Sequence, residues 1–279
     1  GLELSGEYRK LGGQFTYSVG GNIAFISNEL TSLGNGGTPI ASGFLQQANG
    51  FISLTDIGSP IASFYGYETD GIFQDAEEVA AHAFQSNKTA PGDLRFVDQN
   101  DDGVINEDDR TIIGNPTPDF TYGFNGNIGY AGFDLSVFLQ GVQGNDIYRG
   151  FTRLDFENVN VPVSRLNRWT GPGTSNTEPR VIVGDPNQNA RISDYFVEDG
   201  SFLRIKTVQL GYKLPGELLN AIHVKSARVY VSGQNVFTFT NYSGLDPEIG
   251  TRGALEVGID RGFYPQARTW LAGIDVSFQ

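Results

Sequence analysis

Apolar and polar residues alternate along residues 119–143, in two runs separated by Ala131-Gly132. One face of the first run carries Phe120, Tyr122, Phe124, Ile128 and Tyr130, and the other carries Thr121, Gly123, Asn125, Asn127 and Gly129. In the second run Phe133, Leu135, Val137 and Leu139 stand against Asp134, Ser136 and Gln140, and Phe138 interrupts the pattern. Because successive strand residues point to opposite faces, the pattern predicts an antiparallel hairpin with one apolar and one polar face.

Each arm of this hairpin has about the 9–11 residues that a tilted strand needs to cross a bilayer. A half-buried strand of a soluble β-sandwich would show the same alternation. The polar face, however, consists mostly of uncharged Asn, Gly, Thr, Ser and Gln. Aromatic residues also stand at the strand ends, where membrane barrels carry their girdles. The hairpin therefore favours a membrane barrel over a soluble β-protein.

The same alternation recurs along most of the chain and predicts about nine strands. They lie near residues 2–9, 15–25, 44–56, 61–74, 120–130, 133–143, 201–212, 227–242 and 269–278. The short turns near 12, 58, 131 and 215–225 alternate with long loops at 28–43, 75–118, 145–200 and 243–266. Outer-membrane barrels have short periplasmic turns and long external loops, whereas soluble sandwiches show no such regularity. We therefore expect an all-β, antiparallel transmembrane β-barrel.

Three local irregularities modify this pattern. A change of parity after Ile205 predicts a β-bulge at Lys206 or Thr207. Asp75 and Glu78 have the spacing of a capping box and predict one short helix, over about residues 75–85, within a loop. Residues 215–222 are expected to form a turn with one helical coil.

Composition supports the all-β class and narrows the function. The 279 residues include 37 Gly, 20 Phe and 12 Tyr, and no apolar run reaches the ~18 residues of a transmembrane helix. Cysteine is absent, which excludes disulfides and thiolate metal sites, and methionine is absent too. Since no signal peptide is visible, we expect a processed or truncated piece of a longer protein. The net charge of −13 argues against binding to nucleic acid. It is compatible with bound divalent cations and equally with well-solvated acidic loops.

A candidate calcium site lies at residues 98–109, within the long loop 75–118. Counted from its first residue, oxygen ligands fall at positions 1, 3, 5 and 12, with glycine at 6 and a β-branched apolar residue at 8, as in a calcium loop. The predicted ligands are Asp98, Asn100, Asp102, the carbonyl of Val104 and Asp109. Because position 12 is Asp and residues 94–96 look extended, a full EF-hand is not expected. We expect a structural Ca²⁺ that pins the loop; a solvated acidic turn is the alternative.

Several stretches together resemble the SusC/RagA-type TonB-linked outer-membrane transporters of Bacteroidetes. They are SPIASFYGYETDGIFQ (59–74), PGDLRFVDQNDDGVINEDDRTIIGNPTPDFTYGFN (91–125), GFDLSVFLQGVQGNDIY (132–148), VEDGSFLRIKTVQLGYKLP (197–215), SARVYVSGQNVFTFTNYSGLDPE (226–248) and DRGFYPQARTW (260–270). They span nearly the whole chain after about residue 59 and resemble the C-terminal part of such a transporter.

The resemblance implies a barrel of about 22 strands around a plug. It also implies import driven by TonB and a SusD-type lipoprotein lid over the extracellular loops, including 75–118 and 145–200. About nine strands cannot close that barrel, so the remaining strands, the plug and the TonB-contacting segment must lie elsewhere. The expected function is import of oligosaccharides or peptides across a Gram-negative outer membrane, as the SusC-like channel subunit and not as an enzyme.

Two other functions are compatible with parts of the sequence. One is a secreted, calcium-stabilised β-sandwich that binds glycans, in which Arg168 and Trp169 could stack on a sugar, although a lone Trp is more often a packing residue. The other is a hydrolase with paired acids such as Asp185 and Asp194. Only two histidines occur and no nucleophile motif is present, which disfavours an enzyme. Arg168 and Trp169 remain the candidate substrate-binding residues.

Overall fold

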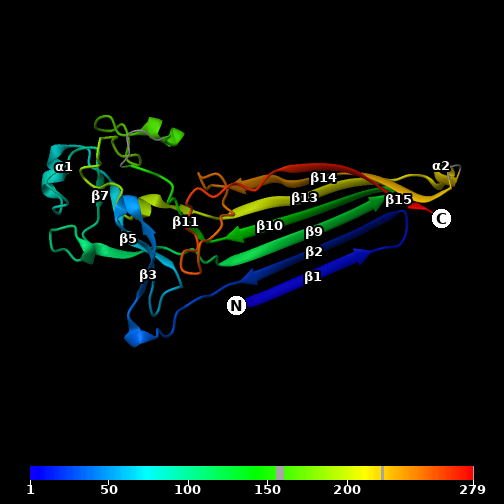
Figure 1. The fold of residues 1–279 in the computed structure, drawn as a ribbon, viewed down its shortest axis with the longest axis horizontal. Helices are drawn as coiled ribbons and strands as arrows, with labels where there is room; N and C mark the ends of the chain where they lie inside the picture. Colours follow the sequence, from blue (N-terminus) through cyan, green and yellow to red (C-terminus); the bar gives the residue numbers. More distant parts are fainter. Residues whose placement is uncertain (155–159, 221–222, 279) are drawn as a thin grey trace.

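A computed structural model describes residues 1–154, 160–220 and 223–278. Its main element is a seven-stranded sheet in the order β1-β2-β9-β10-β13-β14-β15, with every neighbouring pair antiparallel. The strands are β1 (Leu2–Lys10), β2 (Phe15–Phe25), β9 (Phe120–Tyr130), β10 (Phe133–Gln143), β13 (Phe202–Lys213), β14 (Val224–Thr240) and β15 (Thr269–Phe278). They lie side by side in one layer, and most of the remaining chain gathers at one end of it (Figure 1).

The register of the sheet keeps the two faces that the sequence predicts. Residues directly opposite each other in neighbouring strands share a face. One such row, on the apolar face, runs Tyr17, Ile128, Leu135, Leu210 and Val231. The next row, on the polar face, runs Ser18, Asn127, Ser136, Gln209 and Ser232. The alternation along each strand thus becomes one apolar and one polar surface of the whole sheet.

The predicted β-bulge is confirmed. Phe138 stands opposite Thr207 and Leu139 stands opposite Ile205, so Lys206 is the extra residue of β13. The insertion shifts the side-chain parity of β13, and for that reason the apolar positions change from odd to even numbers there. Both faces of the sheet remain continuous across the bulge.

The apolar face of this sheet does not pack into a closed protein interior. Trp270 is 63% exposed and Leu210 is 52% exposed, while Phe120 and Leu135 are half-buried by their neighbours in the same face. A β-sandwich needs two sheets packed face to face through such side chains. The seven strands form a single layer (Figure 1), and the alternative of a secreted sandwich is therefore wrong.

Two of the predicted strands do not belong to this sheet. The segments near 44–56 and 61–74 contribute to a separate four-stranded sheet of β3 (Ile40–Leu45), β4 (Gly50–Thr55), β5 (Ser63–Tyr67) and β8 (Arg110–Gly114). Since β2 pairs directly with β9, residues 26–119 form one long connection, and the turn near residue 58 lies inside it. β4 and β5 have six and five residues, too few for the 9–11 residues or so of a membrane-spanning strand.

The remaining elements are short. β6 (Thr69–Ile72) pairs with β7 (Leu94–Phe96), and β11 (Asp146–Tyr148) pairs with β12 (Val197–Asp199). The 3₁₀ helices are η1 (Asn35–Gly37), η2 (Gln46–Ala48), η3 (Glu107–Asp109), η4 (Val163–Asn167) and η5 (Asp194–Phe196). Among the described residues, no helix has the length and apolar character needed to cross a bilayer.

The loop helix predicted over 75–85 is confirmed, although it ends earlier. Helix α1 spans Ala76–Ala81, and the Asp75 carboxylate accepts hydrogen bonds of 2.9 Å from the backbone N–H groups of Glu77 and Glu78. A second helix, α2 (Gly216–Asn220), forms within the turn predicted at 215–222. The last two residues of that predicted turn, 221–222, lie outside the described residues.

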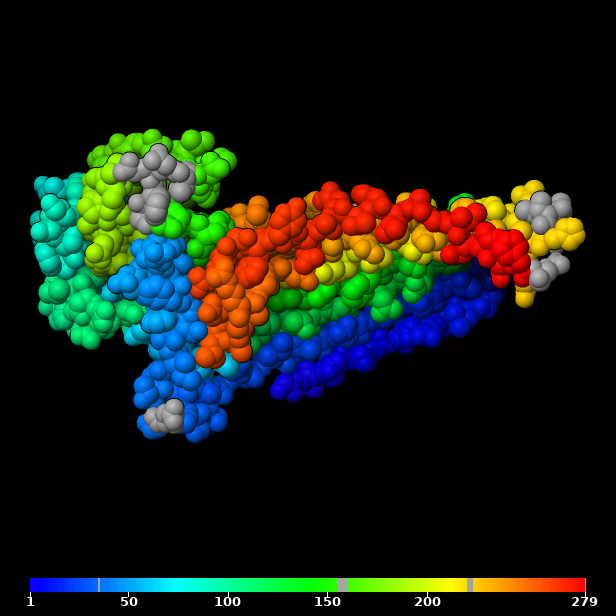
Figure 2. All heavy atoms as spheres, in the orientation of Figure 1, coloured from blue at the N-terminus to red at the C-terminus, as the bar shows by residue number. Residues whose placement is uncertain are grey.

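Most of the buried core lies in the loops; a smaller cluster of Leu219, Val224 and Ala227 lies where α2 meets β14 of the long sheet. We call the described residues of 26–118, 144–200 and 241–268 the loop lobe; it forms the compact mass at one end of the molecule in Figure 2. One cluster contains Leu45, Ile52, Phe64, Tyr148, Ile192, Phe196 and Ile259, and another contains Ile72, Leu94, Phe96 and Ile105. The three connections therefore fold together into one packed body at one end of the strands.

Candidate functional site

The polar face of the long sheet carries hydrogen-bonded rows of uncharged side chains. The amide nitrogen of Asn127 donates to the hydroxyl of Ser18 at 3.1 Å, and the hydroxyl of Ser136 donates to the amide oxygen of Asn127 at 2.7 Å. This row crosses three strands, β2, β9 and β10, and it leaves polar groups facing away from the apolar surface. Such a surface can line a water-filled path for solutes rich in hydroxyl or amide groups.

A charged row crosses the same face nearer the α2 end of the sheet. Arg228 of β14 donates from Nε to the Asp134 carboxylate at 2.9 Å and from Nη1 to Asp275 at 3.3 Å. The guanidinium passes over Gly211, where an added Cβ would lie 2.3 Å from Nη2. Because Gly211 has no side chain, Arg228 can pass over it and link strands β10, β14 and β15.

The last loop, 241–268, is fixed to the polar face by a buried arginine. Arg204 of β13 is 2% exposed and forms ion pairs with Asp246 and, at 2.8 Å, with Glu248. Lys206 adds an ion pair of 2.7 Å to Glu248. The second oxygen of Asp246 accepts the backbone N–H of Gln266 at 2.8 Å. Both halves of the loop are therefore held against the polar face where the strands meet the loop lobe.

A buried tyrosine also fastens this loop. The Tyr242 hydroxyl donates to the Asp260 carboxylate at 2.7 Å, and the other oxygen of Asp260 accepts the backbone N–H groups of Gly262 and Phe263 at 2.8 and 3.1 Å. Burial, followed by the hydrogen bond to Asp260, raises the pKa of Tyr242 far above its usual value. The phenol therefore stays protonated and keeps donating throughout the pH range of living cells.

The acidic stretch 98–109 forms a tight loop whose carboxylates bind its own backbone. Asp98 accepts the N–H of Gly103 at 2.8 Å, and Asp102 accepts the N–H of Val104 at 2.9 Å. Asp109 is buried and accepts the N–H groups of Gln99 and Asn106 at 2.9 and 2.7 Å. The chain bends through positive φ angles at Asp101 (58°) and Gly103 (84°), which is the bend that the glycine predicts.

These contacts bring the predicted calcium ligands Asp98, Asn100, Asp102, Val104 and Asp109 into one turn. The amide nitrogen of Asn100 donates to the Asp102 carboxylate at 3.1 Å. Within the described part of the chain, no three His, Cys, Asp or Glu side chains converge closely enough to hold a metal ion. The calcium site stays a prediction.

Trp169 contributes to the core of the loop lobe. Its ring packs against the cluster around Ile72 and Phe96, and its indole N–H donates to the side-chain oxygen of Gln74 at 3.2 Å. It also lies against Gly92, where an added Cβ would be 2.5 Å from the ring. Arg168 is exposed beside it. These contacts account for Trp169 as a packing residue, whereas Arg168 is exposed and makes one long hydrogen bond of 3.5 Å to the carbonyl of Arg165.

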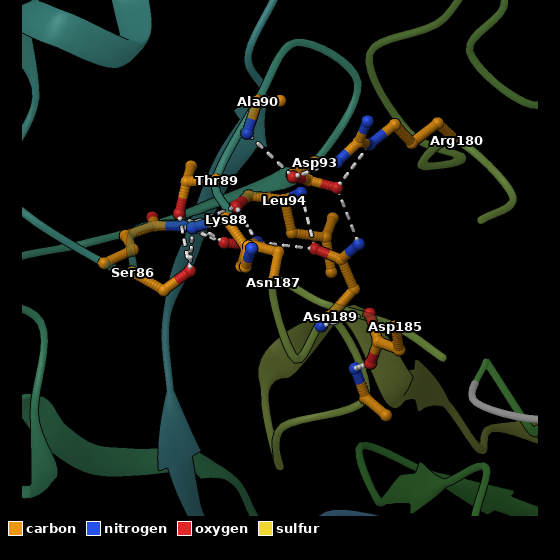
Figure 3. Close-up of polar contacts among 12 residues, drawn as sticks. Ser86, Lys88, Thr89, Ala90, Asp93, Leu94, Arg180, Asp185, Asn187 and Asn189 are labelled. Atoms are coloured by element: carbon orange, nitrogen blue, oxygen red, sulfur yellow. Dashed lines mark hydrogen bonds and ion pairs between the residues drawn. The ribbon is translucent and has the colours of Figure 1, made fainter. Parts of the chain in front are cut away.

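Segments far apart in sequence join in a buried polar network (Figure 3). The fully buried Asp93 carboxylate receives two hydrogen bonds of 2.8 Å from Arg180 and one of 3.1 Å from the side-chain nitrogen of Asn189. The side-chain oxygen of Asn189 accepts the backbone N–H of Leu94 at 3.0 Å. Asn187 extends the network by accepting the Thr89 hydroxyl at 2.6 Å. The network clamps residues 89–94 to residues 180–189.

Comparison with known proteins decides the family. No family model matches the chain. The chain is 35% identical over 291 residues to TonB-dependent receptor P3 of Formosa agariphila, covering 100% of this chain and 28% of that protein. It is 30% identical over 266 residues to TonB-dependent receptor SusC of Bacteroides thetaiotaomicron, covering 95% of this chain and 24% of that protein. The chain belongs to the SusC/RagA-type TonB-dependent receptors.

The fold agrees with this assignment. The structure of the RagAB peptide transporter matches with a TM-score of 0.73 at 24% identity, covering 99% of this chain and 28% of that chain. The RagAB peptide importer in the "open-open" state matches with a TM-score of 0.68 at 25% identity. The receptor segment thus spans about a quarter of the length of the relatives that it matches.

The predicted all-β fold of a transmembrane barrel is confirmed. This fold assigns a different environment to each of the two faces of the sheet. In such a barrel the apolar face contacts lipid and the polar face lines the interior. Thus in this receptor segment Leu210 and Trp270 face the bilayer, while Ser136 and Arg204 face the lumen. Sequence reasoning missed Arg204, Asp93, Arg110 and Arg191, because their partners lie in distant parts of the chain.

Proposed function

We propose that the complete receptor imports oligosaccharides or peptides across the outer membrane, in a TonB-dependent manner, as the SusC-like channel subunit. The observation that carries this proposal is the seven-stranded amphipathic sheet with long loops at one end, in a chain of which 99% matches part of a RagAB chain. The RagAB structures are of a peptide transporter, which supports peptides as ligands, whereas oligosaccharides are proposed from the resemblance to SusC-type transporters. The proposal assigns the receptor no catalytic step.

A SusD-like surface lipoprotein is the proposed partner at the loop lobe. The remaining barrel strands, the plug and the segment that contacts TonB would be supplied by the rest of the receptor. The interior face supports this function because its uncharged Asn, Ser, Thr and Gln side chains offer hydrogen bonds to a polar solute without holding it by strong charge. Loop 241–268, fixed by Arg204, would narrow the solute path along β13 and β14 at the end next to the loop lobe.

The test is an uptake assay with labelled oligosaccharides and peptides in cells that produce the complete receptor. Uptake should require the receptor and should stop when TonB is deleted. Isolation of the receptor from outer membranes in mild detergent should recover a lipoprotein partner. Uptake that continues at the same rate without TonB would contradict the import mechanism, and a receptor found only in the soluble fraction would contradict the location.

We also propose that residues 98–109 bind a structural Ca²⁺. The order of oxygen ligands, the glycine bend and the buried position of Asp109 support this site. The double variant Asp98→Ala, Asp102→Ala should lose about one Ca²⁺ per receptor and become sensitive to protease in this loop. Asp108→Ala, which removes an exposed carboxylate outside the ligand set, is the matched control. Equal calcium content in the unaltered receptor, the double variant and Asp108→Ala would exclude the site.

A further inference from the structure

A polar cleft of about 550 Å³ opens in the loop lobe between η2, the start of β8 and residues 184–192. Its charged and polar lining includes Gln47, Asn49, Glu107, Arg110, Gln188 and Arg191. These residues come from three separate parts of the sequence, so the cleft exists only in the folded lobe. Two guanidinium groups, of Arg110 and Arg191, therefore share one cavity with the carboxylates of Glu107 and Asp185.

Arg110 is positioned by an aromatic ring and by backbone carbonyls. Its guanidinium lies 4.6 Å above the ring centre of Tyr65, and Nη2 donates to the carbonyls of Phe51 and Tyr65 at 3.1 and 2.9 Å. Its Nε is buried and has no hydrogen-bond partner in the described structure. The side chain is thus fixed by neutral groups, and its charge is not matched by a carboxylate.

Arg191 is held in the same manner. Its guanidinium lies 5.0 Å from the ring centre of Phe96 and 5.6 Å from that of Tyr67, and Nη2 makes a long bond of 3.5 Å to the carbonyl of Gln85. Stacking on aromatic faces orients a guanidinium without neutralising it. Burial lowers the pKa of Arg191, but an arginine stays charged at neutral pH in any case. The group therefore presents a permanent positive charge to the cleft.

The absence of a carboxylate partner distinguishes this pair from other buried or half-buried arginines. Ion pairs within 4.0 Å hold Arg95, Arg149, Arg165, Arg180, Arg204, Arg228 and Arg261. No described carboxylate forms such a pair with Arg110 or Arg191, although the protein carries a net charge of −13. Of the two acids that line the cleft, Glu107 is exposed, and Asp185 accepts two backbone N–H groups at 2.8 Å and attracts Arg191 without forming an ion pair with it.

We propose that this cleft binds a carboxylate group of the transported ligand, through Arg110 and Arg191. Guanidinium groups bind carboxylates through paired, charge-assisted hydrogen bonds, and a partly desolvated cleft strengthens such bonds. The neutral side chains of Gln47, Asn49 and Gln188 would bind the amide or hydroxyl groups next to that carboxylate. The inference rests on the proposed import function and specifies its ligand as an acidic one, either a uronate-containing oligosaccharide or an acidic peptide.

The test uses the complete receptor in detergent and titration calorimetry with two acidic probes, trigalacturonate and triglutamate. The amino terminus of the peptide is acetylated, and each probe has a neutral control, the methyl ester of the sugar acid and the fully amidated peptide. At least one acidic probe should bind, and its neutral form should bind at least ~10-fold more weakly. The probe that binds identifies the source of the carboxylate. Because this comparison uses the unaltered receptor, it does not depend on how variants fold.

Variants then assign the effect to the cleft. Arg110→Gln and Arg191→Gln should each weaken binding of the acidic probe by about 10- to 100-fold, and Lys at either position should weaken it less. Arg252→Gln, which removes the same charge from an exposed position in loop 241–268, should bind like the unaltered receptor. Raising the salt concentration should weaken binding of the acid but not of its neutral form.

Three results would overturn the inference: no binding of either acid, equal binding of acid and neutral forms, or equal affinity in Arg252→Gln and the cleft variants. Uptake separates this failure from failure of the import proposal. If cells that carry Arg110→Gln or Arg191→Gln still import all ligands in a TonB-dependent way, import stands and the carboxylate site falls. If uptake is independent of TonB, the import proposal itself falls.

Discussion

Asp93 and Arg180, which are 87 residues apart in sequence, form a bidentate ion pair with two hydrogen bonds of 2.8 Å in the interior of the loop lobe. The carboxylate of Asp93 is fully buried, and the Arg180 side chain is 20% exposed. We predict that Arg180→Met destabilises the lobe by about 3–5 kcal/mol, because it leaves a buried charge unpaired. Limited proteolysis of the complete receptor should show new cleavage between residues 85 and 95.

The matched control is Arg95→Met, which breaks an ion pair with Asp70, a residue that is 71% exposed. Exposed ion pairs contribute about 0–1 kcal/mol, so this variant should keep the cleavage pattern of the unaltered receptor. Equal protease resistance of Arg180→Met and Arg95→Met would show that the Asp93 network does not hold the lobe together.

Arg204 and Arg228, both on the lumen face, should likewise differ in how much stability is lost when each is replaced. Arg204→Met leaves the 8%-exposed Asp246 without its partner, and we expect a loss of about 3–5 kcal/mol together with release of loop 241–268. Arg228→Met leaves Asp134 and Asp275, which are 37% and 64% exposed, and should cost about 0–1 kcal/mol. Urea unfolding in detergent gives the free energies, and proteolysis reports the loop. A larger loss in Arg228→Met would contradict the role of Arg204 as the loop anchor.

Adjacent residues of β13 test which face meets the lipid. Leu210 lies on the apolar face and Gln209 on the polar face. Leu210→Arg should cost about 2–4 kcal/mol if that position lies near the middle of the bilayer, and it should reduce the folded receptor recovered from outer membranes. Gln209→Arg adds the same charge to the water-filled side and should assemble normally. Normal assembly of Leu210→Arg with failure of Gln209→Arg would reverse the assignment of the faces.

The Asp146 carboxyl predicts how the stability of the receptor depends on pH. Burial raises the pKa of its carboxyl above the ordinary value of 3.8, while the hydrogen bond of 2.7 Å from the backbone N–H of Asn115 opposes the shift. A pKa raised by folding means that the protonated acid contributes stability below pH 3.8, and that this contribution is lost as the pH rises through the folded value. Asp146→Asn keeps the acceptor oxygen without the charge. The variant should be more stable than the unaltered receptor at pH 8 and equal to it at pH 3, as measured by thermal unfolding. A difference that grows toward low pH would contradict the sign of the shift.

Part of the fold could be predicted from local patterns. The hairpin of β9 and β10, the two faces of the sheet and the bulge at Lys206 follow from side-chain parity, which any strand displays within its own sequence. The cap of α1 at Asp75 is local for the same reason. The strands at 44–56 and 61–74 show the same alternation as the others, so parity alone could not exclude them from the barrel wall.

The sequence by itself determined that this chain forms amphipathic antiparallel strands, and its residues carried the resemblance to a receptor family. The tertiary structure alone decided which strands share a sheet, that Trp169 is a packing residue, and that Arg110 and Arg191 meet in one cleft. The physical reason is the range of the interactions. Strand parity and helix caps involve neighbours a few residues apart, whereas contacts that build the loop lobe join distant segments, such as Asp93 and Asn189, which are 96 residues apart.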